Sequence, residues 1–351
     1  MPYKRPTIRD VAKKTGLSVS TISLVLNEHE SVSDKTRRNV KQAITDLKYH
    51  PRRSARGLAS RTSGNIGFIL TEDHFLQAEP FYSKVFLGTE FEARRHEYYV
   101  LLTTVSKGRV DLRQTPRFLL EHNVDGIIIA GKISHGWIDE CLRRDLPVVL
   151  IDFEEPVRRI STVVIDNRGG ARMAAEHLLN LGHTRIGFLA GDLKHPSIAE
   201  RAAGFKEALR THGIDARPEW MITDQRETGI ENGAAAARQL FARPGDRPTA
   251  IFAANDAMAI GCLQALKDLK MAVPKDVALV GFDDIETGLH VEPRLSTVHV
   301  NKEELGAIAV RRLVELMTAG SPSLTRTAAS VDLVVRESSG GLMGSVASKS
   351  A

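Results

Sequence analysis

The stretch TIRDVAKKTGLSVSTISLVLN, residues 7–27, decides how the chain begins. Thr7 and Asp10 have the spacing of a capping box, with aspartate where glutamate is usual, so a helix is expected to start here. Gly16 ends that helix, and Ser18 caps a second helix whose apolar residues again fall on one face. Two short helices joined by a glycine-containing turn are typical of a helix-turn-helix.

A third helix is expected from Ser33, because Val40, Ala43 and Leu47 follow at helical spacing. Packing the three helices together leaves the hydroxyl-rich side of the second helix exposed. Hydroxyl groups at a helix N-terminus suit phosphate oxygens, because backbone N–H groups and the helix dipole already point there. Such a helix also fits the major groove, which is about 12 Å wide. This pattern favours DNA binding over a three-helix unit that serves packing alone.

Positive charge is concentrated in the same part of the chain. Residues 1–60 hold 13 lysines and arginines against 5 acidic residues, a net charge of +8, whereas the whole chain of 351 residues carries +5. The remainder therefore carries −3. A basic head on a near-neutral body is typical of a protein that binds a polyanion through one domain.

These motifs resemble the DNA-binding head of the lactose-repressor/galactose-repressor (LacI/GalR) family. The matching segments are residues 7–12, 16–23, 25–27, 32–37 and 47–51. The resemblance implies that Val19, Ser20 and Leu24 read bases, although the family usually has a cation or histidine at the position of Leu24. The other DNA contacts that it implies are Thr7, Ser18, Thr21, Ser23, Asn27, Ser33, Thr36, Tyr49 and Arg53.

A hinge is expected at residues 51–62, after a DNA-binding domain of residues 1–50. Pro51 should end the third helix, and residues 52–60 have three arginines, one glycine and little apolar surface, so a helix there is marginal on its own. A flexible basic linker is the alternative. The family resemblance implies a helix that orders on DNA and wedges Leu58 into the minor groove.

From Ser63 onward, short β-rich runs alternate with helical stretches. Unbroken apolar strands in such an alternation predict parallel sheets covered on both faces, and some ten units exceed one domain. The fold class is therefore an all-α helix-turn-helix head plus an α/β body of two lobes with parallel sheets, which the resemblance makes periplasmic-binding-protein-like. The expected lobes are 63–161 with 295–325 and 162–294 with 326–338, followed by a flexible tail at 339–351.

Polar residues at strand ends are the candidates for a ligand site, because ligands bind beyond the carboxyl ends of parallel strands. Asp152, Asn255 and Asp283 each follow an apolar run. Any one of them could instead cap a helix or a turn. The resemblance implies effector contacts from Arg201, Asn255 and Asp283, with Asp152, Ser197 and Phe81 as weaker candidates.

Several classes of protein are disfavoured. The sequence has no phosphate-binding glycine loop, no nucleophile elbow and no zinc-protease motif, so an enzyme is not expected. No cofactor and no metal site are predicted, since the 12 histidines lack ligand spacing and only Cys141 and Cys262 are present. A solute-binding transport protein would share the body, but an export signal and a membrane-spanning run are absent, so the cytoplasm is expected.

The sequence therefore predicts a transcriptional regulator of the repressor type that is associated with the nucleoid when bound to operator DNA. The resemblance implies a homodimer, because the tail lacks the leucine heptads of the helix that pairs dimers into tetramers in some family members. A palindromic operator is expected, because its half-sites match the two-fold axis of a dimer. The predicted effector is a small polar molecule, with a sugar favoured and a purine or nucleoside as the alternative. A regulator of the same architecture without an effector is the remaining possibility.

The hinge hypothesis predicts the effect of Leu58→Gly. Glycine removes the wedge and lowers helix propensity, so operator affinity should fall far more than affinity for non-specific DNA. Binding titrations against both kinds of duplex measure the two losses. Equal losses would remove Leu58 from the mechanism.

Overall fold

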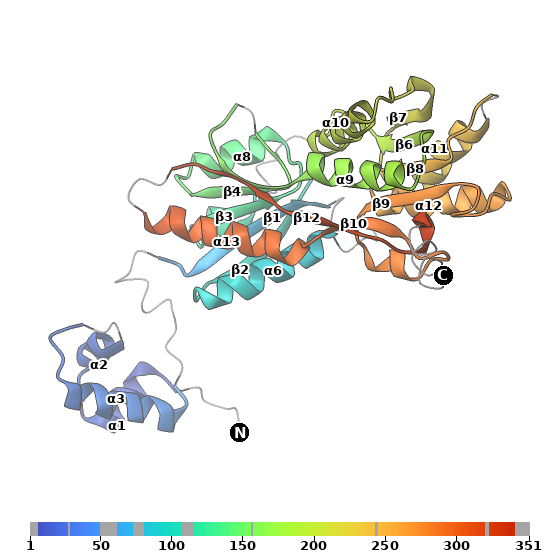
Figure 1. Cartoon of the computed structure of the whole chain (residues 1–351). Helices are drawn as coiled ribbons and strands as arrows, with labels where there is room; N and C mark the ends of the chain where they lie inside the picture. Colours follow the sequence, from blue (N-terminus) through green and yellow to red (C-terminus); the bar gives the residue numbers. More distant parts are fainter. Residues whose placement is uncertain are drawn as a thin grey trace. The chain divides into compact units, whose positions relative to one another are not determined.

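The computed structural model describes residues 6–26, 29–49, 62–72, 81–106, 115–155, 157–242, 245–319 and 323–340. The chain divides into two compact units: Met1–Asn65 with Phe118–Asp125, and Ile66–Arg117 with Gly126–Ala351. Figure 1 traces the chain through both. Asn27, Arg53 and Leu58, almost all of the expected hinge and nearly all of the expected tail lie outside the described residues.

The first unit contains the expected helix-turn-helix. Its helices are α1 (Ile8–Thr15), α2 (Val19–Leu26) and α3 (Asp34–Leu47). Gly16 ends α1 in the left-handed conformation, at φ 70°, which glycine adopts without steric cost. The small core of the head consists of Val11, Ile22, Val25, Val40, Ala43 and Tyr49, all buried.

The second unit contains two six-stranded sheets, one in each lobe (Figure 1). The first sheet has the order β11 (Arg326–Ala329), β5 (Ser161–Ile165), β4 (Val148–Ile151), β3 (Gly126–Ala130), β1 (Asn65–Thr71) and β2 (Tyr99–Val105). The second has the order β12 (Val331–Val334), β10 (Ser296–Val300), β9 (Ala278–Asp283), β8 (Ala250–Ala253), β6 (Ile186–Gly191) and β7 (Met221–Gln225). Strand β12 runs antiparallel to β10, whereas β6, β8, β9 and β10 pair in parallel. The expected parallel α/β body is thus confirmed.

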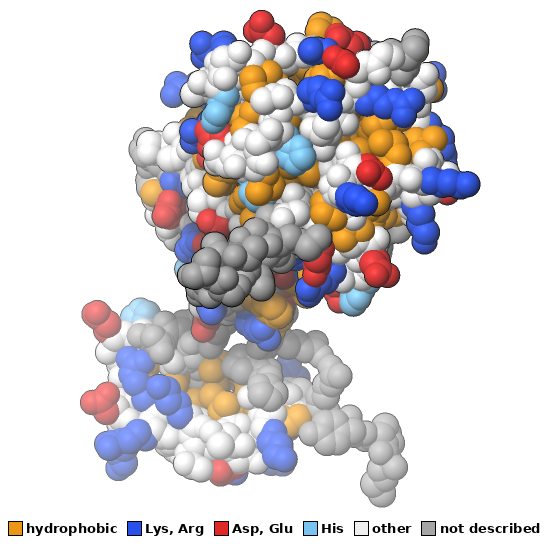
Figure 2. All heavy atoms as spheres, turned by 45° about the vertical axis from the view of Figure 1, so that its right-hand side comes forward, with side chains coloured by type: hydrophobic (Ala, Val, Ile, Leu, Met, Phe, Trp, Pro, Cys, Tyr) orange, Lys and Arg blue, Asp and Glu red, His pale blue; other side chains and the backbone are white. Residues whose placement is uncertain are grey.

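Helices cover these sheets in closely packed pairs. In the first lobe, α6 (Phe81–Arg95) packs on α13 (Lys302–Thr318), and a short helix, α8 (His135–Leu142), precedes β4. The division between the two units falls within the short helix α7 (Arg117–Leu120). In the second lobe, α9 (Asn167–Asn180) pairs with α10 (Pro196–Thr211), and α11 (Ile230–Ala242) pairs with α12 (Asp256–Asp268). The described residues include short 3₁₀ turns at Pro218–Trp220, Glu286–Leu289 and Glu337–Ser339. On the face of the body that Figure 2 shows, basic and acidic side chains are interspersed among hydrophobic ones, in keeping with its near-neutral charge.

The expected lobe boundaries are wrong by one strand at each crossing. Strand β5 pairs with β4 in the first sheet, β10 lies between β9 and β12 in the second, and β11 pairs with β5 in the first. The chain therefore crosses between lobes after β5, after β10 and between β11 and β12. Each of these strands is short and apolar or small, so its residues fit either sheet, and hydrophobic pattern alone could not assign it.

A close helix crossing in the second lobe yields a stability prediction. A Cβ on Gly261 of α12 would lie 1.9 Å from the backbone oxygen of Ile230 on α11. Gly261→Ala therefore forces the two helices apart, and overpacking of this kind costs about 1–3 kcal/mol. Thermal unfolding followed by circular dichroism should show a melting temperature lower by several degrees.

The matched control is Gly229→Ala, just before α11, where the nearest atom to a new Cβ would be Asn232 Oδ1 at 3.5 Å. This variant should melt close to the natural protein. A Gly261→Ala protein that melts with the control would show that the helix pair tolerates separation.

Candidate functional site

Serine and threonine hydroxyls cap the helices of the head. Ser18 Oγ accepts from the backbone N–H of Thr21 at 3.1 Å, and the two side-chain oxygens lie 2.9 Å apart. Ser33 and Thr36 repeat this arrangement at the start of α3, with distances of 3.3 and 2.9 Å. A hydroxyl has one hydrogen and two lone pairs, so capping leaves capacity for a phosphate oxygen. At the start of α1, Asp10 accepts from both the backbone N–H and the hydroxyl of Thr7, at 2.7 Å each.

The three residues expected to read bases lie on the exposed side of α2. Val19, Ser20 and Leu24 are exposed, and Ser23 is half-buried, while Ile22 and Val25 face the core. The Tyr49 side chain is only 6% exposed and packs in the core of the head. The contact of Tyr49 with DNA stays a prediction.

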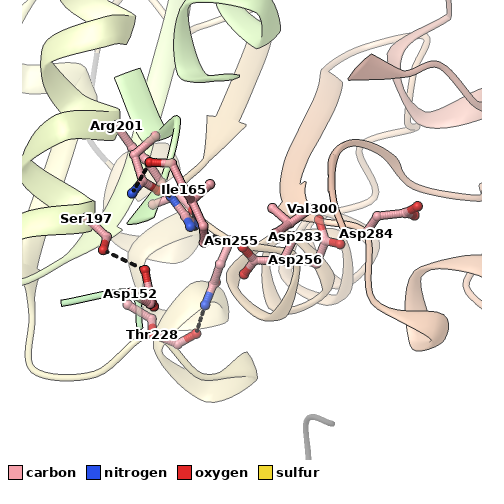
Figure 3. A network of polar contacts seen from close by, with 12 residues as sticks. Asp152, Ile165, Ser197, Arg201, Thr228, Asn255, Asp256, Asp283, Asp284 and Val300 are labelled. Carbon is pink, nitrogen blue, oxygen red and sulfur yellow. Dashed lines mark hydrogen bonds and ion pairs between the residues drawn. The ribbon is translucent and has the colours of Figure 1, made fainter. Parts of the chain in front are cut away.

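Asp152 lies at the centre of a contact between the two lobes. It follows β4 of the first lobe and adopts φ 57°, a left-handed backbone conformation that is uncommon outside glycine. Its carboxylate accepts from Ser197 of α10 in the second lobe at 3.2 Å and from the Tyr82 phenol of α6 at 3.0 Å. Figure 3 shows Asp152 and Ser197 pointing toward each other.

Burial raises the pKa of the Tyr82 phenol well above its usual value, and the nearby Asp152 carboxylate raises it further. The phenol therefore keeps its proton and remains a donor to Asp152. A pocket is lined by Asp152 and Ser197 together with Asn167, Glu200 and Arg326, among others. Two of the predicted effector residues thus face one hollow of the body.

Arg201, on α10, is buried and fully engaged with its surroundings. Its guanidinium donates to Asn167 Oδ1 at 2.8 Å, to the Ala254 carbonyl at 2.5 Å and to Asp283 Oδ1 at 3.1 Å. It also lies over the Phe282 ring, 3.7 Å from the centroid. This one side chain joins the start of α9 to the carboxyl ends of β8 and β9.

Asn255 caps α12, which is the alternative that the sequence left open. Its Oδ1 accepts from the Met258 N–H at 2.9 Å, and its Nδ2 donates to the Thr228 carbonyl at 3.0 Å (Figure 3). Phe81 is half-buried beside Tyr82, with ring centroids 5.0 Å apart in an edge-to-face arrangement. The side chains of the six predicted effector residues thus come from both lobes: Phe81 and Asp152 from the first, and Ser197, Arg201, Asn255 and Asp283 from the second.

The sequence did not single out Lys302, which is also buried at a crossing. At the start of α13, its ammonium donates to the carbonyls of Asp283, Asp284 and Val300, the last two at 3.2 Å. These carbonyls belong to the second lobe, whereas α13 packs on the first. Burial lowers the pKa of Lys302, and the nearby Asp283 carboxylate counteracts this shift. No local motif marks this lysine, and the same holds for Tyr82 and Asn167.

Asp256, at the start of α12, is a fully buried carboxyl. It accepts from the Thr297 hydroxyl at 2.6 Å and from the Ile285 N–H at 2.9 Å. Burial raises its pKa well above the usual value, and the neighbouring Asp283 carboxylate raises it further. Burial also raises the pKa of Asp283, which Arg201 partly opposes. Low solvation is therefore the main cause of the raised pKa of both carboxyls, which lie near each other in Figure 3.

Comparison with known proteins accounts for both units. The family of periplasmic binding protein-like domains matches residues 175–339, and the family described as bacterial regulatory proteins, lacI family, matches residues 7–52. The HTH-type transcriptional repressor PurR of Photobacterium profundum is 32% identical over 335 residues, which cover 95% of this chain and 98% of the relative. The chain belongs to the LacI family.

Other LacI-family proteins extend this likeness. The ribose operon repressor of Escherichia coli (strain K12) is 32% identical, over 89% of this chain and 93% of the relative. A crystal structure of the lac repressor dimer bound to operator and the anti-inducer ONPF has a TM-score of 0.79 and 29% identity, and covers 96% of this chain and 99% of that one. This LacI-family chain is accordingly a transcriptional regulator and not an enzyme, as the sequence predicted.

Membrane-spanning helices and metal-ligand clusters are both absent from the described part of this LacI-family chain. Within it, no helix has the length and apolar character to cross a membrane. The same residues contain no group of three or more histidine, cysteine, aspartate or glutamate side chains arranged to hold a metal ion.

The raised pKa of Asp256 predicts how stability depends on pH. Because the folded pKa exceeds the unfolded value, the contribution of Asp256 to stability is fully present below the unfolded pKa and is lost as pH rises through the folded pKa. Asp256→Asn keeps the shape of the side chain and removes this decline. The unfolding free energy of the variant relative to the natural protein should therefore increase between about pH 5 and about pH 8.

Urea unfolding at several pH values measures this difference. Asp268→Asn, at the other end of α12, is the control, because that carboxylate is largely exposed and faces Arg238 at 3.1 Å. A free-energy difference for Asp256→Asn that stays constant with pH would contradict the assignment.

Proposed function

We propose that this regulator binds a palindromic operator as a dimer and is switched by a small neutral polyol, a sugar or sugar derivative, bound between the two lobes. The observation that carries this proposal is the polar cluster at the lobe crossings, where Asp152 meets Ser197 and Arg201 meets Asp283. A ligand placed there touches both lobes at once.

The charges of the cluster favour a sugar over an anionic ligand. Asp152 and Asp283 present carboxylate oxygens, which accept hydrogen bonds from hydroxyl groups. Arg201, the cation among the predicted effector residues, already donates to three protein acceptors. A phosphate or carboxylate would therefore meet two acidic groups and a cation whose charge is already paired with Asp283. The ribose operon repressor among the relatives supports the same ligand class.

A purine is the second candidate. Phe81 and Tyr82 form an edge-to-face pair beside Asp152, and such rings pack against a flat heterocycle as well as against a sugar face. The similarity to the repressor PurR supports this alternative. Calorimetry on both ligand classes distinguishes them.

Support for a dimer comes from an apolar edge of the first lobe. Leu87 and Phe91 of α6 are exposed, as are Tyr99 and Leu102 of β2, which is an edge strand of its sheet. An exposed apolar surface beside an open sheet edge is typical of an interface. The related lac repressor structure is a dimer on operator DNA, and a two-fold dimer matches a palindromic site.

The proposal is tested by calorimetry with ribose, cellobiose, adenosine and adenine, using the full chain. We expect one sugar to bind and to change operator affinity, where the operator is first selected from a random duplex library. Arg201→Ala should weaken sugar binding by about tenfold or more while operator binding without sugar persists, because Arg201 fixes Asp283 and Asn167.

Arg172→Ala on α9 is the matched control, because this arginine is exposed and faces only Glu176 at 3.3 Å. It should bind the sugar like the natural protein. Operator binding with no ligand in any class would favour a regulator without effector, and sedimentation of the same samples reports the oligomeric state.

A further inference from the structure

The exposed face of α2 carries no charge and combines serine hydroxyls with the apolar side chains of Val19 and Leu24. The helix, VSTISLVL, carries no charged residue, and Val19 and Leu24 are 42% and 38% exposed. Ile22 and Val25 are 0% and 3% exposed and pack in the head core, which fixes the rotation of the helix. At 100° per residue, Leu24 and Ser20 then lie opposite Ile22.

A single exposed leucine is common on protein surfaces and carries no argument by itself. Leu24 is significant because of where it lies on the helix. It lies at the centre of the face that a helix-turn-helix presents to the major groove, beside Ser20 and one turn beyond the Ser18–Thr21 cap. At that position a side chain meets base edges rather than bulk water.

Only one base offers an apolar group in the major groove, namely thymine with its C5-methyl. A leucine cannot donate to the O6 and N7 acceptors of guanine or pair with adenine. It would also leave those groups without water if pressed against them, which is unfavourable. An apolar side chain at this place thus selects thymine by contact and disfavours guanine by desolvation.

We propose that Leu24 is a specificity-determining residue that packs on a thymine methyl group in each half of the operator, with Val19 extending the same apolar surface. This inference rests on the proposed function, because it requires a specific operator. It adds the chemical identity of one base and the atom by which that base is read.

Affinity for DNA comes from other elements of the head. Basic side chains lie on α1 and α3, for example Lys13, Lys14, Arg37, Arg38 and Lys41, and none lies on α2. Contacts to phosphate set the salt dependence of binding, whereas an apolar contact to a methyl group does not. Truncating Leu24 should therefore reduce specificity and leave the salt slope unchanged.

The test begins with selection of an operator by the full-length protein from a random duplex library. Each thymine of the selected half-site is then replaced in turn by deoxyuridine, which lacks only the methyl group. At one position we expect the natural protein to lose roughly fourfold in affinity per half-site, and roughly fifteenfold when both half-sites are changed. Leu24→Ala should bind the thymine and deoxyuridine duplexes equally at that position.

Two further variants sharpen the result. Leu24→Arg should, on renewed selection, move the preferred base from thymine to guanine, because arginine pairs with O6 and N7. Leu181→Ala truncates an exposed leucine of the body and should retain the full thymine preference of the natural protein.

The outcomes separate the two proposals. Failure of the selection to enrich any sequence would overturn the proposed function itself. An enriched operator for which Leu24→Ala keeps the same thymine-to-deoxyuridine ratio at every position would overturn only the role of Leu24. The loss of that ratio at one position, with an unchanged salt slope, supports it.

Discussion

The buried guanidinium of Arg201 is the constraint on which the ligand-facing end of the second lobe depends. A charge with 5% exposure is tolerated only when it is paired and hydrogen-bonded, and Arg201 meets both conditions through Asn167, Ala254 and Asp283. These partners come from the start of α9 and the ends of β8 and β9. Removing the cation would leave Asp283 buried without its nearest counter-charge, so one side chain fixes the relative positions of three elements.

Lys302 is a second side chain that holds the backbone where the chain passes between the lobes. The end of β9 bends sharply, with Asp283 and Asp284 at φ 106° and 53°, and the Lys302 ammonium holds the carbonyls of both residues. Such backbone conformations cost about 1–3 kcal/mol each and persist only where neighbours hold them. Because α13 belongs to the first lobe, the strained turn of the second lobe is held by a side chain from the other side.

Caps and apolar spacing within a short segment predicted the helices of the head, whereas contacts between residues distant in the sequence were not predicted. The caps at Ser18 and Ser33 and the apolar spacing after them specify α2 and α3 within the sequence itself. Sheet membership is different, because β5 and β10 are short strands that each extend the sheet of the preceding strand, and their sequences do not show on which side of a lobe crossing they lie. Tyr82 and Asn167 likewise became recognisable only through Asp152 and Arg201, their partners in space. Tyr49 packs in the core of the head, a role that its place in the sequence did not reveal, and its contact with DNA stays a prediction.

In the proposed mechanism, a ligand in the cleft competes with hydrogen bonds that the protein already makes. Asp152 accepts from Ser197 across the lobes, so a ligand hydroxyl that takes this acceptor replaces a bond between lobes with a bond to itself. Its free energy of binding then depends on the separation of the lobes. A ligand shifts a conformational equilibrium only through such differential affinity, and a site confined to one lobe would bind without consequence. Because the Asp152 carboxylate lies at the boundary between the lobes, ligand binding there would change the relative stability of different lobe arrangements.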